Sequence, residues 1–247
     1  MTNRILLAFA AFLTVTGIYS QDFQGVATYE EKTLIEGFNR IYTLSFDKTS
    51  SLYKTEKTYG KAGQTFTSTG GSMDGSKYID LKQKKYTQEI NFFDKEFLVS
   101  DPLEAMEWKT TNETKMIGQY KCFKATRVIK MNYGSEEDMK KSNFSRSMLD
   151  ELPKEIIVTA WYTPEIPVSH GPDLNWGLPG LILEIIKQGE STTCSKIVLN
   201  PKDKVVIKAP VKGKKVTYAE FEKIAGAKLE EMRAQSNGGI LIQGVGN

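Results

Sequence analysis

WYTPEIPVSHGPDLNWGLPGLILEII, from Trp161 to Ile186, constrains the architecture of this chain more than any other stretch. It carries four of the eight prolines, and the runs at its two ends predict buried strands. Because proline fixes φ and lacks an amide donor, neither a helix nor a central strand can hold the prolines. We therefore expect a stiff, ordered segment that leads from one strand to the next, and we call this segment the crossing.

Local signals within this stretch predict where each strand stops and where the chain turns. The β-branched and aromatic run Ile156–Tyr162 predicts a strand that ends at Pro164. Gly171–Asp173 predicts a turn, and Leu178–Leu181 predicts a type II turn in which Gly180 supplies a positive φ. The run that follows predicts a strand buried on both sides except at Glu184.

Short alternating or β-branched runs separated by turn residues fill most of the remaining chain. Arg40–Phe46 is a clear case, with Tyr42, Leu44 and Phe46 on one face. Regular spacing of such runs predicts an antiparallel meander. The other predicted strands lie at 23–30, 51–57, 77–81, 84–91, 95–100, 106–111, 119–130, 192–199 and 204–208.

One segment, Tyr218–Gln235, predicts a helix that packs on the sheet. Thr217 and Glu220 have the spacing of a capping box. A helical stripe follows, formed by Phe221, Ile224, Ala225, Leu229 and Met232. Together these signals predict a mainly β protein: a strongly curved antiparallel sheet, open and half-barrel-like, with one C-terminal helix. A β-sandwich is the alternative.

The N-terminus predicts a signal peptide over residues 1–20. Arg4 precedes the apolar run Ile5–Val15, which is too short for a spanning helix, and Ser20 is a small residue at the expected cut. No cysteine lies near the cut, so a lipoprotein attachment site is missing. We expect a periplasmic or secreted protein without a stable transmembrane anchor after cleavage.

The mature chain, residues 21–247, is predicted to be a single mainly β domain. We expect a helical or disordered insertion at 135–152, a mobile loop at 60–75 and a flexible tail at 236–247. Removing residues 1–20 leaves 32 basic and 30 acidic residues. This balance argues against a nucleic-acid partner, because such binders concentrate basic charge on one face.

The two cysteines, Cys122 and Cys194, allow two interpretations. In an oxidising compartment they would close one disulfide, and otherwise they are two separately buried thiols. Spacing alone does not choose between these interpretations. A redox role is not expected, because the chain has no Cys-x-x-Cys pair.

Chemistry-bearing residues are sparse, and the crossing holds most of them. His170 is the single histidine, so a histidine-based metal cluster is excluded, and no cofactor motif occurs. Glu165 and Asp173 could form a carboxylate pair, although such residues usually solvate a loop. The aromatic residues could form a ligand groove or a core plug. The candidate ligand- or partner-binding residues are Trp161, Tyr162, Glu165, His170, Asp173 and Trp176.

The chain resembles the GLPGLI family of secreted bacterial envelope proteins, whose function is uncharacterised. The naming hexapeptide is formed by Gly177, Leu178, Pro179, Gly180, Leu181 and Ile182. Trp161–Thr163, Ile166–Ser169, Gly171–Pro172 and the strand Gly118–Ala125 also fit the family pattern, so the resemblance covers about residues 115–187. The resemblance implies secretion in diderm bacteria and genes that neighbour outer-membrane transport systems. It supplies no catalytic residues.

Three functions follow as expectations. The leading one is a non-enzymatic periplasmic binding module with a hydrophobic ligand in a curved-sheet cavity near Trp176, by analogy with bacterial lipoprotein carriers. The second is an accessory subunit of an outer-membrane transport or assembly complex. The third and least favoured is a hydrolase that uses His170 or Glu165.

Overall fold

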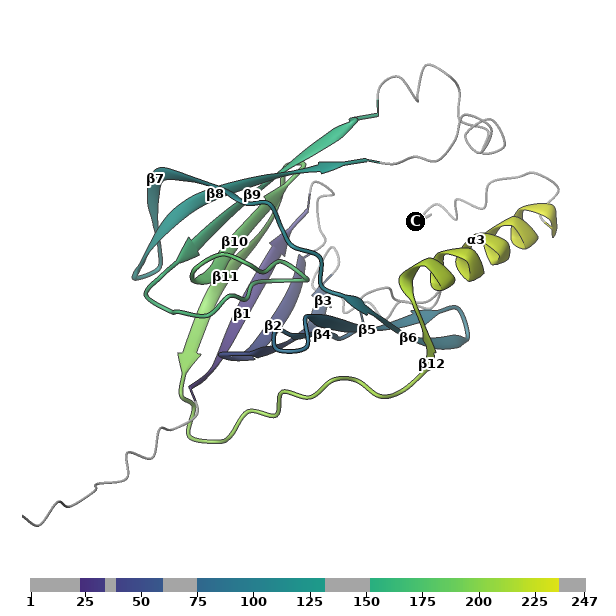
Figure 1. Ribbon diagram of the computed structural model, residues 1–247, viewed down its shortest axis with the longest axis horizontal. Coiled ribbons are helices and arrows are strands. Elements are labelled where there is room, and N and C mark those ends of the chain that lie inside the picture. Colours follow the sequence, from purple (N-terminus) through teal and green to yellow (C-terminus); the bar gives the residue numbers. More distant parts are fainter. Residues whose placement is uncertain (1–22, 34–38, 60–74, 132–151, 236–247) are drawn as a thin grey trace, which may run out of the picture.

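The protein folds into one open, curved sheet with a helix at one end (Figure 1). The computed structural model describes residues 23–33, 39–59, 75–131 and 152–235. The described strands form a single sheet, so the half-barrel expectation is confirmed and the sandwich alternative is wrong. The strands are β1 Gln24–Lys32, β2 Asn39–Asp47, β3 Ser50–Tyr59, β4 Lys77–Asp80, β5 Lys85–Phe92, β6 Lys95–Pro102, β7 Lys109–Ile117, β8 Tyr120–Lys130, β9 Glu155–Thr163, β10 Leu181–Lys187, β11 Glu190–Leu199 and β12 Lys214–Val216.

Two antiparallel meanders build the sheet. Strands β1 to β6 form the first meander and β7 to β11 the second, and the two join where β1 pairs antiparallel with β11. The strand order is β12-β6-β5-β4-β3-β2-β1-β11-β10-β9-β8-β7. Strand β12 pairs parallel with β6 and forms one edge, while β7 forms the other. The N-terminal strand therefore lies inside the sheet.

Two predicted strands differ from the structure. The run expected at 106–111 is displaced, since β7 spans Lys109–Ile117. The strand expected at 204–208 is wrong: these residues form no strand. Their nearest strand, β1, already pairs with β2 and β11, so no free edge remains for another ladder. The amide of Gln24 instead bonds both the backbone N–H and the carbonyl of Val205, at 3.2 and 3.3 Å.

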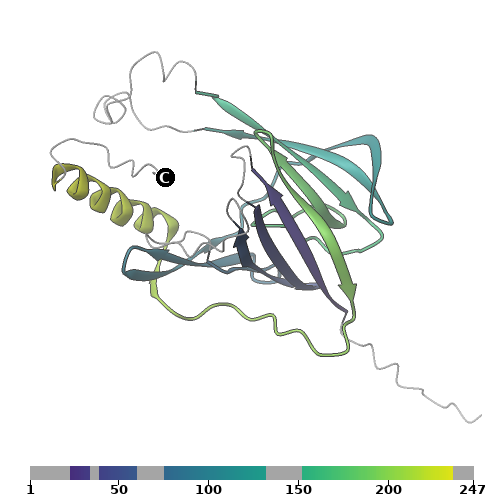
Figure 2. The ribbon, with the colours of Figure 1, turned by 180° about the vertical axis from the view of Figure 1, so that it is seen from behind.

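The helix α3, Tyr218–Gln235, packs against the first meander, beside β6 and β12 (Figures 1 and 2). The capping box is confirmed: Glu220 Oε2 accepts from the Thr217 N–H at 2.8 Å, and Thr217 Oγ1 accepts from the Glu220 N–H at 3.2 Å. Phe221 and Ala225 are buried against Phe97 and Val99, whereas Leu229 is 46% exposed. The first half of the predicted stripe thus holds the helix in place.

The crossing from Pro164 to Gly180 packs against strands of both meanders. Ile166 and Val168 pack with Tyr29 and Leu183 in one buried cluster, and Leu178 packs with Ile182 in another. Tight turns surround two of its prolines, because Val168 N–H donates to the Ile166 carbonyl and Gly180 N–H to the Leu178 carbonyl. The segment is therefore a core plug with a stiff backbone.

The turn at Leu178–Leu181 differs from the predicted type II turn. The Leu181 N–H donates to Ile166 rather than back to Leu178, and the chain makes a three-residue turn around Pro179. Gly180 has a φ of 155°, and a Cβ there would lie 2.2 Å from the Thr163 carbonyl oxygen. Glycine is required at this position because the backbone at the end of β9 passes against it.

Several expectations concern segments outside the described residues. These are the signal peptide at 1–20, the tail at 236–247, and all but the last residue of the loop at 60–75 and of the insertion at 135–152. Among the residues that are described, no helix is long and apolar enough to cross a membrane.

Candidate functional site

A charged pocket of about 260 Å³ lies where the crossing meets both meanders. We call it the crossing pocket. Its walls come from β1, β2, β3 and β4 on one side, from β8 to β11 on the other, and from the crossing itself. The side chains that give it its character are Glu31, Arg40, Tyr42, Tyr53, Lys77, Arg127, Asp173, Asn175, Lys187 and Glu190.

Hydrogen-bonded charges define the first-meander side of this pocket. Arg40 Nη1 lies 3.2 Å from Glu31 Oε1, across the β1–β2 pairing. The Tyr42 hydroxyl donates to the other oxygen of Glu31 at 3.0 Å. Lys77 Nζ, at the start of β4, donates to Asp173 Oδ1 in the crossing. This ion pair joins the crossing, which connects β9 and β10 of the second meander, to a strand of the first meander.

Of the partly buried cations in this pocket, Arg127 is the one without an ion pair to a carboxylate among the described residues. Its Nη2 donates to the neutral amide oxygen of Asn175 at 3.1 Å, and its guanidinium lies 5.3 Å from the centre of the Trp108 ring. Its Nε is buried and has no hydrogen-bond partner among the described residues. Burial lowers the pKa of Arg127, and the charge of Asp173 only partly opposes this. An anionic group beside Arg127 would relieve the cost of this desolvation.

Tyr53 supplies a neutral donor to the same pocket. Its ring stacks on Tyr42 with centroids 4.9 Å apart and meets Tyr29 edge to face at 6.3 Å. Burial raises the pKa of Tyr53 well above its ordinary value, and the neighbouring Tyr42 and Asp173 add to the effect. The phenol therefore stays protonated and can donate a hydrogen bond.

Only one of the predicted site residues, Asp173, lines the crossing pocket. Its φ of 59° places it at the turn of a small loop in which His170 and Trp176 form an isolated bridge. Glu165 is used elsewhere: its Oε1 accepts from the Lys121 N–H at 2.9 Å. The proposed carboxylate pair of Glu165 and Asp173 thus has its two members bound to different elements.

The predicted aromatic residues serve mainly in packing. Lys115 Nζ lies 4.6 Å from the centre of the Trp161 ring, and Tyr162 packs against Phe123 in a buried cluster. The Trp176 carbonyl accepts from Trp108 Nε1 at 2.8 Å. These contacts support the core-plug interpretation over a ligand groove.

His170 is fully buried and cannot meet a substrate. It is 0% exposed, and neither ring nitrogen has a hydrogen-bond partner among the described residues. Desolvation lowers its pKa to about 4, although the nearby Asp47 opposes the shift. The single histidine of the chain is therefore a neutral core residue at physiological pH.

Both cysteines are free thiols in the structure. Burial raises the pKa of Cys122 to about 11 and that of Cys194 to about 12. Thiols of this kind are poor nucleophiles at neutral pH. Within the described residues, no group of three His, Cys, Asp or Glu side chains is arranged to hold a metal ion.

Sequence reasoning missed most of the crossing pocket. Arg40, Lys77 and Arg127 lie far apart in the chain and belong to three different strands. No local motif connects them, because their proximity depends on the pairing of β1 with β11. The one signal of this pocket in the sequence was the presence of charged residues within runs that otherwise predict half-buried strands.

Fold and site together define a mainly β protein with an open curved sheet and a polar pocket at the crossing. Residues 108–184, which span β7 to β10 and the crossing, match a family described as "Protein of unknown function (Porph_ging)". No curated protein matches the chain.

Two solved structures share the fold. Both are of PNGF-II, in the C2 and P21 space groups, with TM-scores of 0.53 and 0.51 and 16% sequence identity. They match 83% and 82% of this chain, which in turn spans 33% of the PNGF-II chain. At this identity the likeness concerns the fold alone.

Proposed function

We propose that this protein is a non-enzymatic binding module of the bacterial cell envelope, and that the crossing pocket holds a small ligand through a carboxylate. The observation that carries the proposal is Arg127, a half-buried guanidinium whose one hydrogen-bond partner among the described residues is a neutral amide. A planar guanidinium matches a carboxylate in shape and charge. Such a ligand would supply the countercharge that the pocket lacks at this position.

The remaining groups of the pocket suit the rest of a polar ligand. Tyr53 offers a protonated hydroxyl, and Asp173 and Glu190 offer acceptors for amino or hydroxyl groups. An acyl chain fits these walls poorly, because charged groups would lose water without gaining partners. The apolar side chains of the crossing, Ile166, Val168 and Leu178, are already buried in the core. We therefore favour a polar ligand over a hydrophobic one.

The cellular setting belongs to the same proposal. Membership of the GLPGLI family is supported by the hexapeptide at 177–182, which ends the crossing and starts β10 in a conformation that requires Gly180. Cleavage after Ser20 would release residues 21–247 into the periplasm or the medium. Amino-terminal sequencing of protein recovered from an envelope fraction tests this step, and a mature chain that still begins at Met1 contradicts it.

The free edge of β7 favours a second candidate function, an accessory subunit of an outer-membrane assembly. Among the described strands β7 pairs only with β8, and Met116 on it is 60% exposed. An open edge can accept a strand from a partner. Co-purification from detergent-solubilised envelopes tests this candidate, and recovery as a lone monomer counts against it.

Two matched ligand pairs test the leading proposal. Calorimetric titration of the mature protein with trialanine and its C-terminal amide, and with galacturonate and galactose, isolates the carboxylate in two chemical settings. The proposal expects at least one acid to bind about tenfold or more tighter than its neutral partner. Palmitate is titrated as well, as the apolar ligand for comparison. Binding of palmitate alone, or no preference within either pair, overturns the proposal.

A further inference from the structure

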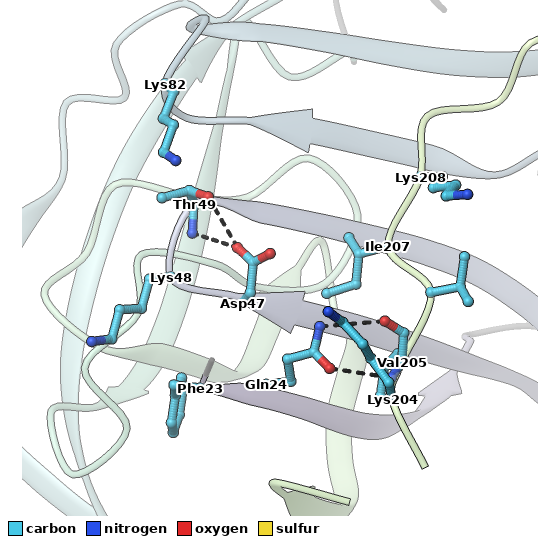
Figure 3. Close-up of a pocket in the computed structure, with 11 residues that line it drawn as sticks. Phe23, Gln24, Asp47, Lys48, Thr49, Lys82, Lys204, Val205, Ile207 and Lys208 are labelled. Atoms are coloured by element: carbon cyan, nitrogen blue, oxygen red, sulfur yellow. Dashed lines mark hydrogen bonds between the residues drawn. The ribbon is translucent and has the colours of Figure 1, made fainter. Parts of the chain in front are cut away.

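A second pocket lies at the opposite end of β1 and β2 (Figure 3). We call the segment 200–213, which joins β11 to β12, the strap, and this hollow the strap pocket. The strap pocket has a volume of about 670 Å³ and is lined by Gln24, Asp47 and strap residues. Along β1, Gln24 lies seven residues from Glu31 in the crossing pocket. At about 3.3 Å per residue the two pockets are roughly 23 Å apart.

Four lysines surround the strap pocket. Lys48 and Lys82 come from turns that follow β2 and β4, and Lys204 and Lys208 come from the strap. In Figure 3 the two turn lysines lie on one side of the pocket and the two strap lysines on the other. The positive charges therefore come from three separate segments of the chain.

These four ammonium groups lack carboxylate partners within the described structure. The only acid among the described lining residues is Asp47, and its Oδ1 already accepts from Thr49 N–H and Ser50 N–H, each at 2.7 Å. Other lysines of the described structure do form ion pairs with carboxylates: Lys77, Lys115, Lys124, Lys212 and Lys228. A hollow with four unpaired cations thus calls for an external anion.

Hydrogen bonds to Gln24 hold the first part of the strap, which carries Lys204. Gln24 N–H donates to Asn200 Oδ1 at 3.2 Å, and Asn200 N–H donates to the Gln24 carbonyl at 2.7 Å. The Gln24 amide then makes the two bonds to Val205 already described. These contacts anchor the strap on both sides of Lys204.

We propose that the strap pocket is a binding site for a multiply charged phosphate group. Four lysines can share the charge of a phosphate ester with two or more negative oxygens, and lysine binds phosphate as a point charge without strict geometry. The same chemistry occurs in a soluble phosphorylated molecule and in the headgroup of a phosphorylated lipid. The proposal stands independently of the crossing pocket, whose lining residues are different.

Inorganic triphosphate is the probe for the site itself. Titration at low salt should show binding that the double variant Lys204→Gln/Lys208→Gln weakens about tenfold or more. The matched control is Lys154→Gln/Lys223→Gln, which removes the same charge from exposed positions outside the pocket. Equal weakening in both variants would show a general charge effect and overturn the proposal, as would no binding of triphosphate by the unsubstituted protein.

Vesicles then distinguish the two sources of phosphate. Sedimentation with phosphatidic acid vesicles, but not with phosphatidylcholine vesicles, and its loss on adding triphosphate support a lipid headgroup. Triphosphate binding without vesicle association supports a soluble phosphorylated ligand. Vesicle association that triphosphate does not compete, or that the strap variant retains, contradicts a role for this pocket.

Discussion

The guanidinium Nη2 of Arg127 on β8 lies 3.1 Å from the side-chain oxygen of Asn175 in the crossing. Asn175 is 7% exposed, and its Nδ2 donates to the Pro172 carbonyl at 3.0 Å. This one amide therefore holds the crossing loop in shape and positions the cation of the crossing pocket.

Replacing this amide should destabilise the protein measurably. We expect Asn175→Ala to lower the free energy of unfolding by about 1–3 kcal/mol, because it leaves buried polar groups unpaired. Urea denaturation followed by fluorescence measures the change. Asn112→Ala, at an exposed position on β7, is the control and should stay within about 0.5 kcal/mol of the unsubstituted protein. Equal effects of the two changes would contradict this role for Asn175.

Gly180 and Gly118 offer a second matched comparison. Both have positive φ, but a Cβ at Gly180 would meet the Thr163 backbone, whereas Gly118 has open space. We expect Gly118→Ala to cost about 1–2 kcal/mol from backbone strain. Gly180→Ala should cost at least about 3 kcal/mol or prevent folding, since a backbone clash is added to the strain. Similar urea midpoints for the two variants would show that the close approach at Gly180 is unimportant.

The buried His170 makes stability depend on pH. Its pKa is lowered from about 6.5 to about 4, so the unfolded chain takes up the proton first as pH falls, and stability decreases. Between pH 7.5 and 5.5 we expect a loss of about 1.3 kcal/mol, which should level off below pH 4. Urea midpoints at both pH values measure it.

His170→Asn is the control for that loss, because asparagine does not titrate. Carboxylates contribute equally to the two proteins, so the difference in pH dependence isolates the imidazole. The same loss in His170→Asn and in the unsubstituted protein would contradict a buried neutral histidine.

Thiol chemistry checks the packing of the two cysteines. Because burial raises the pKa of Cys122 and Cys194, we expect both to react slowly with iodoacetamide at pH 7.5 and rapidly in urea. Mass spectrometry without reductant should find both thiols alkylated after denaturation. A mass lower by two hydrogens than that of the reduced chain, together with no alkylation after denaturation, would instead show that Cys122 and Cys194 form a disulfide.

Local signals predicted the elements well and the site poorly, for a physical reason. The capping box at Thr217 and Glu220 involves neighbours in the chain, so the start of α3 could be predicted to the residue. The turn at Pro179 could not, because the Leu181 N–H bonds to a distant carbonyl, that of Ile166. The crossing pocket depends on the same kind of long-range pairing. The prolines of the crossing predicted a stiff segment, but they could not predict which cations lie beside it.

The carboxylate preference of the crossing pocket in the Arg127→Gln variant tests the role of this guanidinium most directly. For whichever acid binds best, calorimetry gives the ratio of dissociation constants between the neutral partner and the acid. We expect Arg127→Gln to reduce this ratio to about one while the protein stays folded, and Lys154→Gln to leave it unchanged. An undiminished preference in Arg127→Gln would show that the carboxylate is recognised elsewhere and would contradict a ligand-binding role for Arg127.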